Sequence, residues 1–311
     1  MWQKETFDTA TIDRELGWAE DLGFNCMRVF LHHLVWENDA DGFKDRIDRY
    51  LAISDHHGIS TMFVFFDDCW NDHYVAGPQP APRKGIHNSG WVKDPGALYF
   101  GEYGAPQPFA RDTAAIVKIL RKYVTDIMTH FKDDRRILAW DLYNEPGGGQ
   151  DPFRYARRSF PLLKDIFAWA RAVNPSQPLT AGVWNPALED MNSWQLQHSD
   201  VITYHTYQTP DKHQTVIDTL KPYGRPIICT EYMARTQGST FQTIMPTLKK
   251  HGIGALNWGL VSGRTNTIFA WDTPLDMDEP PVWFHDILRR DGSPYDPEEV
   301  ACIKSLTNAA Q

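Results

Sequence analysis

The chain has 311 residues, of which 42% are hydrophobic and 23% charged, and its formal net charge at pH 7 is -9. This composition is that of an ordinary folded protein and excludes a disordered or fibrous one. The negative charge argues against nucleic acid or an anionic membrane as a partner, because both bind basic surfaces. A barrel of alternating strands and helices needs about 250 residues, so we expect residues 1–311 to form one domain.

Helix and strand patterns alternate along the chain, which is typical of parallel strands joined by helical crossovers. An opening helix ends at Gly23, where the pattern breaks. Seven strands are predicted, over residues 24–31, 61–66, 137–143, 179–183, 201–204, 226–230 and 254–259. Helices are predicted between them, over residues 43–57, 111–131, 160–173, 187–197, 213–223 and 241–251.

The first strand of a regular barrel is missing from this pattern. A closed barrel has eight strands and opens with one, whereas this chain opens with a helix. The sequence therefore favours an α/β fold of the (β/α)8 TIM-barrel type that is incomplete or modified. The barrel is open, or residues 1–6 partly fill the gap, or a partner chain does, since an unpaired strand edge invites association.

One long irregular segment, residues 67–110, interrupts the alternation. Loops of this length in compact domains are usually functional, so we interpret it as an active-site wall or a partner-binding arm. We expect any homo-oligomer to form through this loop or through the open barrel edge. The loop is rich in aromatic residues, namely Trp70, Tyr74, Trp91, Tyr99, Phe100 and Tyr103.

The first residues of the chain and its cysteines indicate where in the cell the protein is expected to be found. Residues 1–5 lack the apolar segment of a signal peptide, and no uncharged run is long enough to span a bilayer. We therefore expect an unexported protein, cytoplasmic by default. The cysteines show no C-x-x-C spacing, which argues against a disulfide framework or zinc ribbon and favours small core residues, at Cys26, Cys69, Cys229 and Cys302.

Two glutamates, Glu145 and Glu231, stand where apolar strands end, the first of them within Asn-Glu-Pro. The carboxyl ends of parallel barrel strands share one face, where active sites are built. Retaining glycoside cleavage needs a carboxylic acid that protonates the leaving oxygen and a carboxylate about 5–5.5 Å away that attacks the anomeric carbon. A lone glutamate is usually a solvated strand end, but two in this position favour catalysis.

Two neighbouring side chains could support these glutamates. Asn144 offers an amide that could bind a sugar 2-hydroxyl. Arg28 lies inside an apolar strand and needs a partner there. Glu231 would form an ion pair with Arg28, and the positive charge would keep Glu231 ionised as a nucleophile. Partial burial would raise the pKa of Glu145. The alternative is a structural salt bridge from Arg28 to Asp67 or Asp141.

Four segments together resemble clan A glycoside hydrolases, the family 5 cellulase-like and family 2-like retaining enzymes. They are Trp140-Asp-Leu-Tyr-Asn-Glu-Pro146, Thr230-Glu-Tyr232, Asn257-Trp258 and the strand with Arg28, and the resemblance runs from residue 24 to about residue 283. It implies a retaining hydrolase of β-linked oligosaccharides or polysaccharides, a β-glycosidase or endo-β-glycanase without a cofactor. By the resemblance Glu145 is the acid/base and Glu231 the nucleophile, supported by Asn144, Arg28, His205, Tyr207 and Trp258.

Other side chains at strand ends have competing explanations. Packing or capping accounts for Asp68, Trp70 and Trp184 as well as sugar binding does. No His-x-His or His-Glu-x-x-His spacing is present, so we expect no metal. An incomplete barrel could also have lost catalysis, and the alternative function is a catalytically impaired carbohydrate-binding protein derived from such an enzyme.

Overall fold

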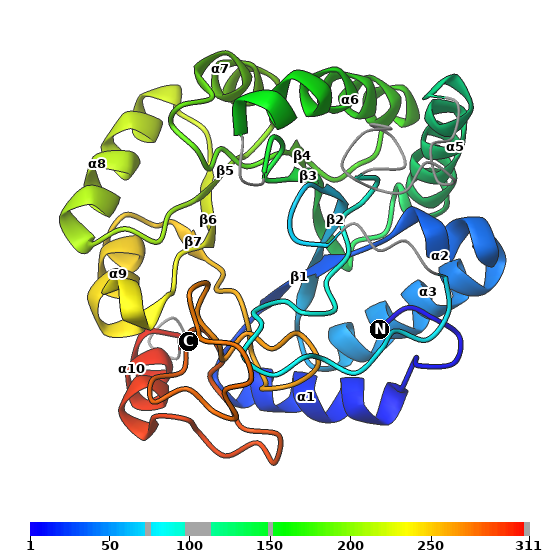
Figure 1. The fold of residues 1–311 in the computed structure, drawn as a ribbon. Helices are drawn as coiled ribbons and strands as arrows, with labels where there is room; N and C mark the ends of the chain where they lie inside the picture. Colours follow the sequence, from blue (N-terminus) through cyan, green and yellow to red (C-terminus); the bar gives the residue numbers. More distant parts are fainter. Residues whose placement is uncertain (72–75, 97–112, 149–151, 308–311) are drawn as a thin grey trace.

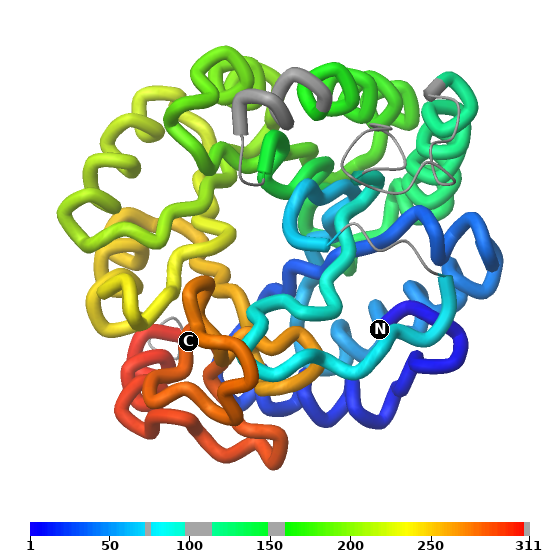
Figure 2. The backbone as a smooth tube through the Cα atoms, viewed as in Figure 1, coloured from blue at the N-terminus to red at the C-terminus, as the bar shows by residue number. Residues whose placement is uncertain are grey.

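The computed structural model describes residues 1–71, 76–96, 113–148 and 152–307. Within these residues the strands line the centre of the molecule, and the helices form an outer layer around them (Figures 1 and 2). Every strand pairing is parallel. The predicted incomplete TIM-barrel fold is therefore confirmed. The described helices include none that is both long and apolar enough to cross a lipid bilayer.

The first half of the chain supplies four strands and the helices that cover them. In chain order these elements are α1 (Thr9–Asp21), β1 (Cys26–Phe30), α2 (His33–Asn38), α3 (Ala40–His56), β2 (Ser60–Asp67), α5 (Thr113–Phe131), β3 (Ile137–Asn144), α6 (Pro152–Val173) and β4 (Leu179–Thr180).

The second half supplies three strands, again each followed by helical or irregular segments. Its elements are α7 (Glu189–His198), β5 (Ile202–His205), α8 (Pro210–Leu220), the 3-10 turn η2 (Lys221–Tyr223), β6 (Ile227–Glu231), the 3-10 turn η3 (Arg235–Gln237), α9 (Phe241–Lys250), β7 (Gly254–Ala255) and α10 (Pro297–Thr307).

The strands form two sheets, in the orders β1-β2-β3-β4 and β5-β6-β7. Val183 joins them, because its N–H donates to the Thr203 carbonyl and its carbonyl accepts from the His205 N–H, both at 3.0 Å. Parallel pairing brings the carboxyl ends of β2 and β3 together, where Asp67 is in register with Asn144. All candidate catalytic residues are consequently directed to one face of the barrel.

The barrel wall is interrupted between β7 and β1, which no pairing connects among the described residues. The two residues of β7, Gly254 and Ala255, are exposed, although barrel strands are normally buried. Helix α1 lies outside this gap, between α3 and α10 (Figure 1), and the Leu22 carbonyl at its end accepts a hydrogen bond from Thr307 at 2.8 Å. The predicted absence of a first strand agrees with this arrangement.

Residues 1–6 add no strand to the gap, although the Trp2 indole N–H donates to the Phe30 carbonyl of β1 at 2.7 Å. They form a turn rather than a strand. Trp2 is buried and packs against Phe43 and Tyr50 of α3 and Phe63 of β2. Its large apolar ring gains more by burial between α3 and the sheet than by lying along a strand edge.

Strand and helix ends differ from the predicted ones where a neighbour is lacking. β4 stops at Thr180 and β7 at Ala255, short of the predicted residues 183 and 259. β7 has β6 as its only partner in the described structure, so its backbone leaves the ladder early. Two helices, α2 and α10, were not predicted at all.

The described parts of the 67–110 loop fold back over the end of β2. Asp67 pairs with Asp94, and Asn71 pairs with Val92. The Trp91 indole N–H donates to Asp67 Oδ2 at 2.5 Å, and its ring packs edge-on against Phe30 and Trp258. This part of the loop forms a wall at the active-site face. The other predicted aromatic residues of the loop lie outside the described residues, namely Tyr74, Tyr99, Phe100 and Tyr103.

Candidate active site

The structure brings Glu145 and Glu231 together at the carboxyl ends of β3 and β6. Oxygen atoms of the two carboxylates and a ring nitrogen of His205 all lie within 4.8 Å of one another. The Glu145 side chain is 18% exposed and that of Glu231 is 8% exposed. The pair is thus partly shielded from water while one of its members still reaches the surface.

A tight turn after β3 aims Glu145 into this group. Glu145 has a φ of +43°, a left-handed conformation that non-glycine residues rarely adopt, and Gly147 follows with a φ of +81°. The Gly148 N–H closes the turn on the Glu145 carbonyl at 2.8 Å. Strained backbone of this kind persists only where the surroundings fix it, and it is frequent at functional sites.

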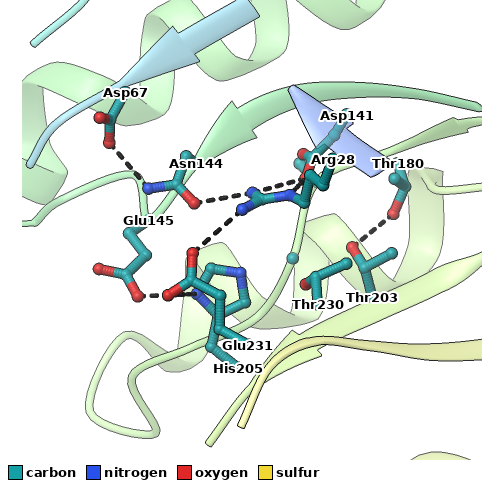
Figure 3. A network of polar contacts seen from close by, with 12 residues as sticks. Arg28, Asp67, Asp141, Asn144, Glu145, Thr180, Thr203, His205, Thr230 and Glu231 are labelled. Carbon is teal, nitrogen blue, oxygen red and sulfur yellow. Dashed lines mark hydrogen bonds and ion pairs between the residues drawn. The ribbon is translucent and has the colours of Figure 1, made fainter. Parts of the chain in front are cut away.

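Arg28 connects the ends of three strands (Figure 3). Its guanidinium contacts Asp141 at 2.8 Å, Glu231 at 3.0 Å and the Asn144 side-chain oxygen at 2.7 Å. The Arg28 side chain is only 6% exposed, and a buried charge needs such partners. Both interpretations of Arg28 therefore apply, since it pairs with Glu231 and also with Asp141. Asp67 fixes the other side of Asn144, whose Nδ2 donates to it at 2.8 Å.

His205 and Tyr207 complete the contacts of the two glutamates. His205 Nδ1 lies 2.7 Å from Glu145 Oε1 and 3.7 Å from Glu231 Oε2. The Tyr207 hydroxyl donates to Glu231 Oε2 at 2.5 Å. Glu231 therefore accepts from Arg28 on one oxygen and from Tyr207 on the other, an arrangement that stabilises a carboxylate.

The protonation of the pair differs from the prediction. Burial would raise the pKa of Glu145, but the hydrogen bond and charge of His205 outweigh it, so this pKa lies below its usual range. Burial raises the pKa of Glu231, and the charge of Glu145 adds to this rise against the opposing effects of His205 and Arg28. Burial lowers the pKa of His205, but the two glutamates raise it by more than burial lowers it, so the net effect is an increase. The expected rise for Glu145 is wrong because the position of His205 could not be read from the sequence.

Asp68 and Trp184 both contact the turn that carries Glu145. Asp68 Oδ2 accepts from the Gly147 N–H at 2.7 Å, and Asp68 Oδ1 accepts from the Tyr143 hydroxyl at 2.8 Å. Burial raises the pKa of Asp68 to about 6. The Trp184 indole donates to the Pro146 carbonyl at 3.2 Å. Asp68 is 1% exposed, which places it behind the turn rather than on a sugar-binding surface.

Three tryptophans surround this group with different exposures. Trp258 is half-buried, and its ring packs edge-on against Phe30. Trp70 is 41% exposed and is the third residue after the end of β2. Trp271 is 48% exposed, and its ring lies 5.3 Å from that of Tyr207. The last two offer open indole surfaces, Trp271 beside Tyr207 and Trp70 next to Cys69 in the chain.

Sequence reasoning missed Cys69, which it treated as a small core residue. The Cys69 thiol donates to Glu145 Oε2 at 3.1 Å. Its position directly after Asp67 and Asp68, at the end of a strand on the active-site face, is the signal that could have found it. The sequence suggests Asp67 as a salt-bridge partner of Arg28, whereas in the structure it accepts from Asn144.

Two groups of three side chains in the described residues have the spacing of a metal site: His32, His33 and Asp94, and Glu145, His205 and Glu231. In the first group the Asp94 carboxylate is hydrogen-bonded to both the imidazole ring and the backbone N–H of His33, and these bonds fix the start of α2. In the second group the Arg28 guanidinium already contacts Glu231, and its charge opposes a cation there. That no metal is needed remains a prediction.

The family model Cellulase (glycosyl hydrolase family 5) matches residues 18–263, which is more than half of the chain. This chain belongs to glycosyl hydrolase family 5. The match spans the strands that carry Arg28, Glu145, His205 and Glu231. No curated protein gave a significant match to it.

Solved structures of two mannanases and a mannosidase share the fold. An endo-β-1,4-mannanase from Thermotoga petrophila has a TM-score of 0.59 at 16% identity, over 97% of this chain and 73% of that one. An endo-1,4-β-mannanase from Rhizomucor miehei gives 0.63 at 15% identity, over 97% and 90% of the two chains. A family 5 mannosidase from the same organism gives 0.60 at 13% identity, over 96% and 87%. Similarity at this level of identity shows the fold alone.

Membership of family 5, which lies in clan A, makes the protein a retaining glycoside hydrolase that acts on oligosaccharides or polysaccharides. The predicted family, fold class and enzyme class are thereby confirmed. The geometry described above supplies the basis for assigning roles to individual residues.

Proposed function

We propose that this family 5 enzyme cleaves β-linked sugars by double displacement, with Glu231 as the nucleophile and Glu145 as the acid/base. The observation that carries the proposal is the separation of the carboxylates, whose nearest oxygens lie within 4.8 Å. Retaining enzymes place the two groups about 5–5.5 Å apart, whereas inverting enzymes leave about 6.5–9.5 Å for a water molecule. The close approach of the two carboxylates agrees with the retaining arrangement.

Glu231 is the better nucleophile of the two. Its oxygens accept from Arg28 and Tyr207, which favours the ionised form that attacks the anomeric carbon. The cation also fixes the direction of the carboxylate, because Arg28 is itself held by Asp141. Burial raises the pKa of Glu231, and the charges of His205 and Arg28 act in the opposite direction, toward the ionised form.

Glu145 obtains its proton from His205 in this proposal. Burial lowers the pKa of His205, but the two glutamates raise it by more, so the pKa is raised overall. The imidazole ring is therefore charged when both carboxylates are ionised. Transfer of the Nδ1 proton over 2.7 Å to Glu145 Oε1 gives a neutral acid, a neutral imidazole and an ionised Glu231. Glu145 then protonates the leaving oxygen, and in the second step it accepts a proton from the water that releases the sugar.

Asn144 binds the sugar 2-hydroxyl in the proposed complex. Its side-chain oxygen accepts from Arg28, and its nitrogen donates to Asp67, so the amide cannot rotate. A second lone pair on the oxygen is available to a ligand, whereas the nitrogen also donates to Cys69 Sγ at 3.9 Å. A fixed amide can strengthen its bond to the 2-hydroxyl in the transition state without reorganising.

The proposed substrate is a β-linked oligosaccharide or polysaccharide, with β-mannan first to be tested. Two of the structural neighbours described above are mannanases and one is a mannosidase. Trp70 and Trp271 present exposed indole rings, and exposed aromatic surfaces suit the apolar faces of sugar rings. We propose that these two tryptophans bind sugar rings of the substrate.

Initial rates on soluble β-mannan, β-glucan, xylan and aryl β-glycosides test this proposal. Wild type should hydrolyse one of these classes, and Glu145→Ala should lose most activity on substrates with poor leaving groups while retaining more on dinitrophenyl glycosides. General acid catalysis contributes about 10²–10⁴-fold to such rates. A wild type that binds an oligosaccharide but cleaves none of the panel would contradict the proposal and favour the carbohydrate-binding alternative.

We also propose self-association through the open edge between β7 and β1, or through the 67–110 loop. The backbone groups at these strand edges have no neighbouring strand among the described residues, and such edges favour pairing with another chain.

A further inference from the structure

Three consecutive residues at the end of β2 contact the turn that carries Glu145. Asp67 accepts from Asn144 Nδ2 at 2.8 Å, Asp68 accepts from the Gly147 N–H at 2.7 Å, and the Cys69 thiol donates to Glu145 Oε2 at 3.1 Å. Figure 3 shows Asp67 beside Asn144, on the opposite side of that amide from Arg28. One short segment, Asp67 to Cys69, thus touches the residue before Glu145, Glu145 itself and the turn after it.

The contact between this segment and the turn is close. A Cβ atom on Gly148 would lie 3.0 Å from the Glu145 carbonyl oxygen, 3.2 Å from Cys69 Sγ and 3.4 Å from Asp68 Cβ. The Cys69 N–H donates to Asp67 Oδ1 at 3.1 Å, which fixes the direction of the segment. The thiol therefore has little freedom to move away from Glu145.

We propose that Cys69 is a positioning residue for the acid/base, its thiol holding Glu145 Oε2 while His205 holds Oε1. This inference rests on the proposed role of Glu145. Each carboxylate oxygen has two lone-pair positions, so the two contacts orient the group and still leave a position for the proton that is transferred. A carboxylate fixed at both oxygens points in one direction toward the leaving group.

The thiol acts as a donor and not as a nucleophile. Burial raises the pKa of Cys69 well above its usual range, and the charges of Glu145 and Asp67 add to the rise. The reactive form of a cysteine is the thiolate, which this environment suppresses. A thiol is a weak donor, so its contribution is to orient Glu145 and to favour the ionised form moderately.

Cys69→Ala and Cys69→Ser test the proposal on two aryl β-glycosides of the preferred sugar, one with a dinitrophenol and one with a poorer phenol leaving group. Cys69→Ala should lose about tenfold in kcat/KM on the poorer leaving group, the size of one hydrogen bond to a charged group. It should lose little on the dinitrophenyl glycoside, which needs no acid. Cys302→Ala, on helix α10, is the matched cysteine control and should behave as wild type.

The pH profile separates positioning from a general structural effect. Loss of a donor to the ionised carboxylate raises the pKa of the acid, so the basic limb of kcat/KM for Cys69→Ala should move to higher pH. The hydroxyl of Cys69→Ser keeps a donor, so this variant should retain the leaving-group dependence and the basic limb of wild type. If Cys69→Ala does not fold, a loss in Cys69→Ser that is equal on both glycosides would overturn the proposal.

Two outcomes distinguish this inference from the proposed function. If Glu145→Ala shows the leaving-group dependence of an acid/base but Cys69→Ala has the rates and pH profile of wild type, the inference on Cys69 is overturned alone. If Glu145→Ala loses activity equally on both glycosides, Glu145 is not the acid/base and both proposals fall.

Discussion

Arg28 illustrates how far a single residue can be interpreted from sequence. A charge inside an apolar strand must be paired, and the sequence offered Glu231, Asp141 and Asp67 as candidate partners. The structure pairs Arg28 with Glu231 and Asp141, because the five donors of a guanidinium can serve several acceptors, while Asp67 contacts Asn144 instead. The direction of the pKa of Glu145 could not be predicted in the same way, since it depends on where the ring of His205 lies.

Asp286 gives a prediction about pH at the scale of one residue. It is fully buried, and its Oδ1 accepts from the Thr267 hydroxyl at 2.7 Å, while no partner is found for Oδ2 in the described residues. Burial raises its pKa from 3.8 to about 7. The folded protein therefore favours the protonated form, and the stability this contributes is present below about pH 4 and lost as the pH rises to about 7.

Urea unfolding of wild type and Asp286→Asn at pH 4 and pH 7.5 measures this effect. The amide cannot ionise, so the unfolding free energy of wild type relative to the variant should fall by about 2–4 kcal/mol over this range. Any cost of burying the amide is the same at both pH values and cancels in the comparison. A difference between the two proteins that does not change with pH would show that Asp286 is not protonated in the fold.

At the scale of elements, the turn after β3 is held against the end of β2 by close packing. Gly148→Ala should displace the Glu145 carbonyl, which lies 3.0 Å from the added Cβ position, and so misdirect the Glu145 side chain. We expect a loss of roughly tenfold in kcat/KM on poor leaving groups and about 1–2 kcal/mol in unfolding free energy. Initial rates measure the loss in kcat/KM, and thermal unfolding measures the loss in stability.

Gly90→Ala is the matched control for that substitution. Nothing lies within 4 Å of the Cβ position on Gly90, so the same chemical change should leave rates and unfolding nearly unchanged. If Gly148→Ala is as active and as stable as Gly90→Ala, the turn tolerates movement and its packing does not position Glu145.

The elements that sequence patterns predicted well are those with strong local signals. Strands β2 and β3 are long apolar runs buried on both faces, and three predicted helix ends carry glycines with φ between 64° and 67° at Gly58, Gly224 and Gly252. Helix α10 was missed although Asp296 and Pro297 form a typical start, where the Glu298 N–H donates to Asp296 at 2.8 Å. Strand β7 is shorter than its pattern because pairing depends on a neighbour far away in sequence.

At the scale of the whole molecule, the described strands form two sheets with separate hydrophobic clusters. The sheets are joined by the Val183 bridge on one side and are separated by the gap between β7 and β1 on the other. Phe63 and Trp140 belong to the first cluster, and Tyr204 and Phe241 to the second. The sequence predicted the gap from a count of strands. It could not predict that α1 lies outside it, because that depends on contacts between the two ends of the chain, such as Thr307 with Leu22.

The open edge predicts self-association in solution. The free edges of β1 and β7 face no neighbouring strand among the described residues, and such edges favour pairing with a second copy. Sedimentation at several protein concentrations should therefore show a species heavier than the monomer of 35.7 kDa, in proportions that grow with concentration. A single monomeric species throughout the series would contradict this prediction. Single-domain organisation, cytoplasmic location and the absence of nucleic-acid or membrane partners likewise remain predictions.

The central claim is that Glu231 is the nucleophile of a double displacement. Its most direct test is the activity of Glu231→Ala on a dinitrophenyl β-glycoside of the preferred sugar, with and without added azide, with the product analysed by proton NMR. The variant should be inactive alone, and azide should restore turnover as the inverted α-glycosyl azide, because the small anion attacks from the side that the carboxylate occupied. Full activity of Glu231→Ala without azide, or rescue of Glu145→Ala to the inverted α-azide in its place, would contradict this assignment.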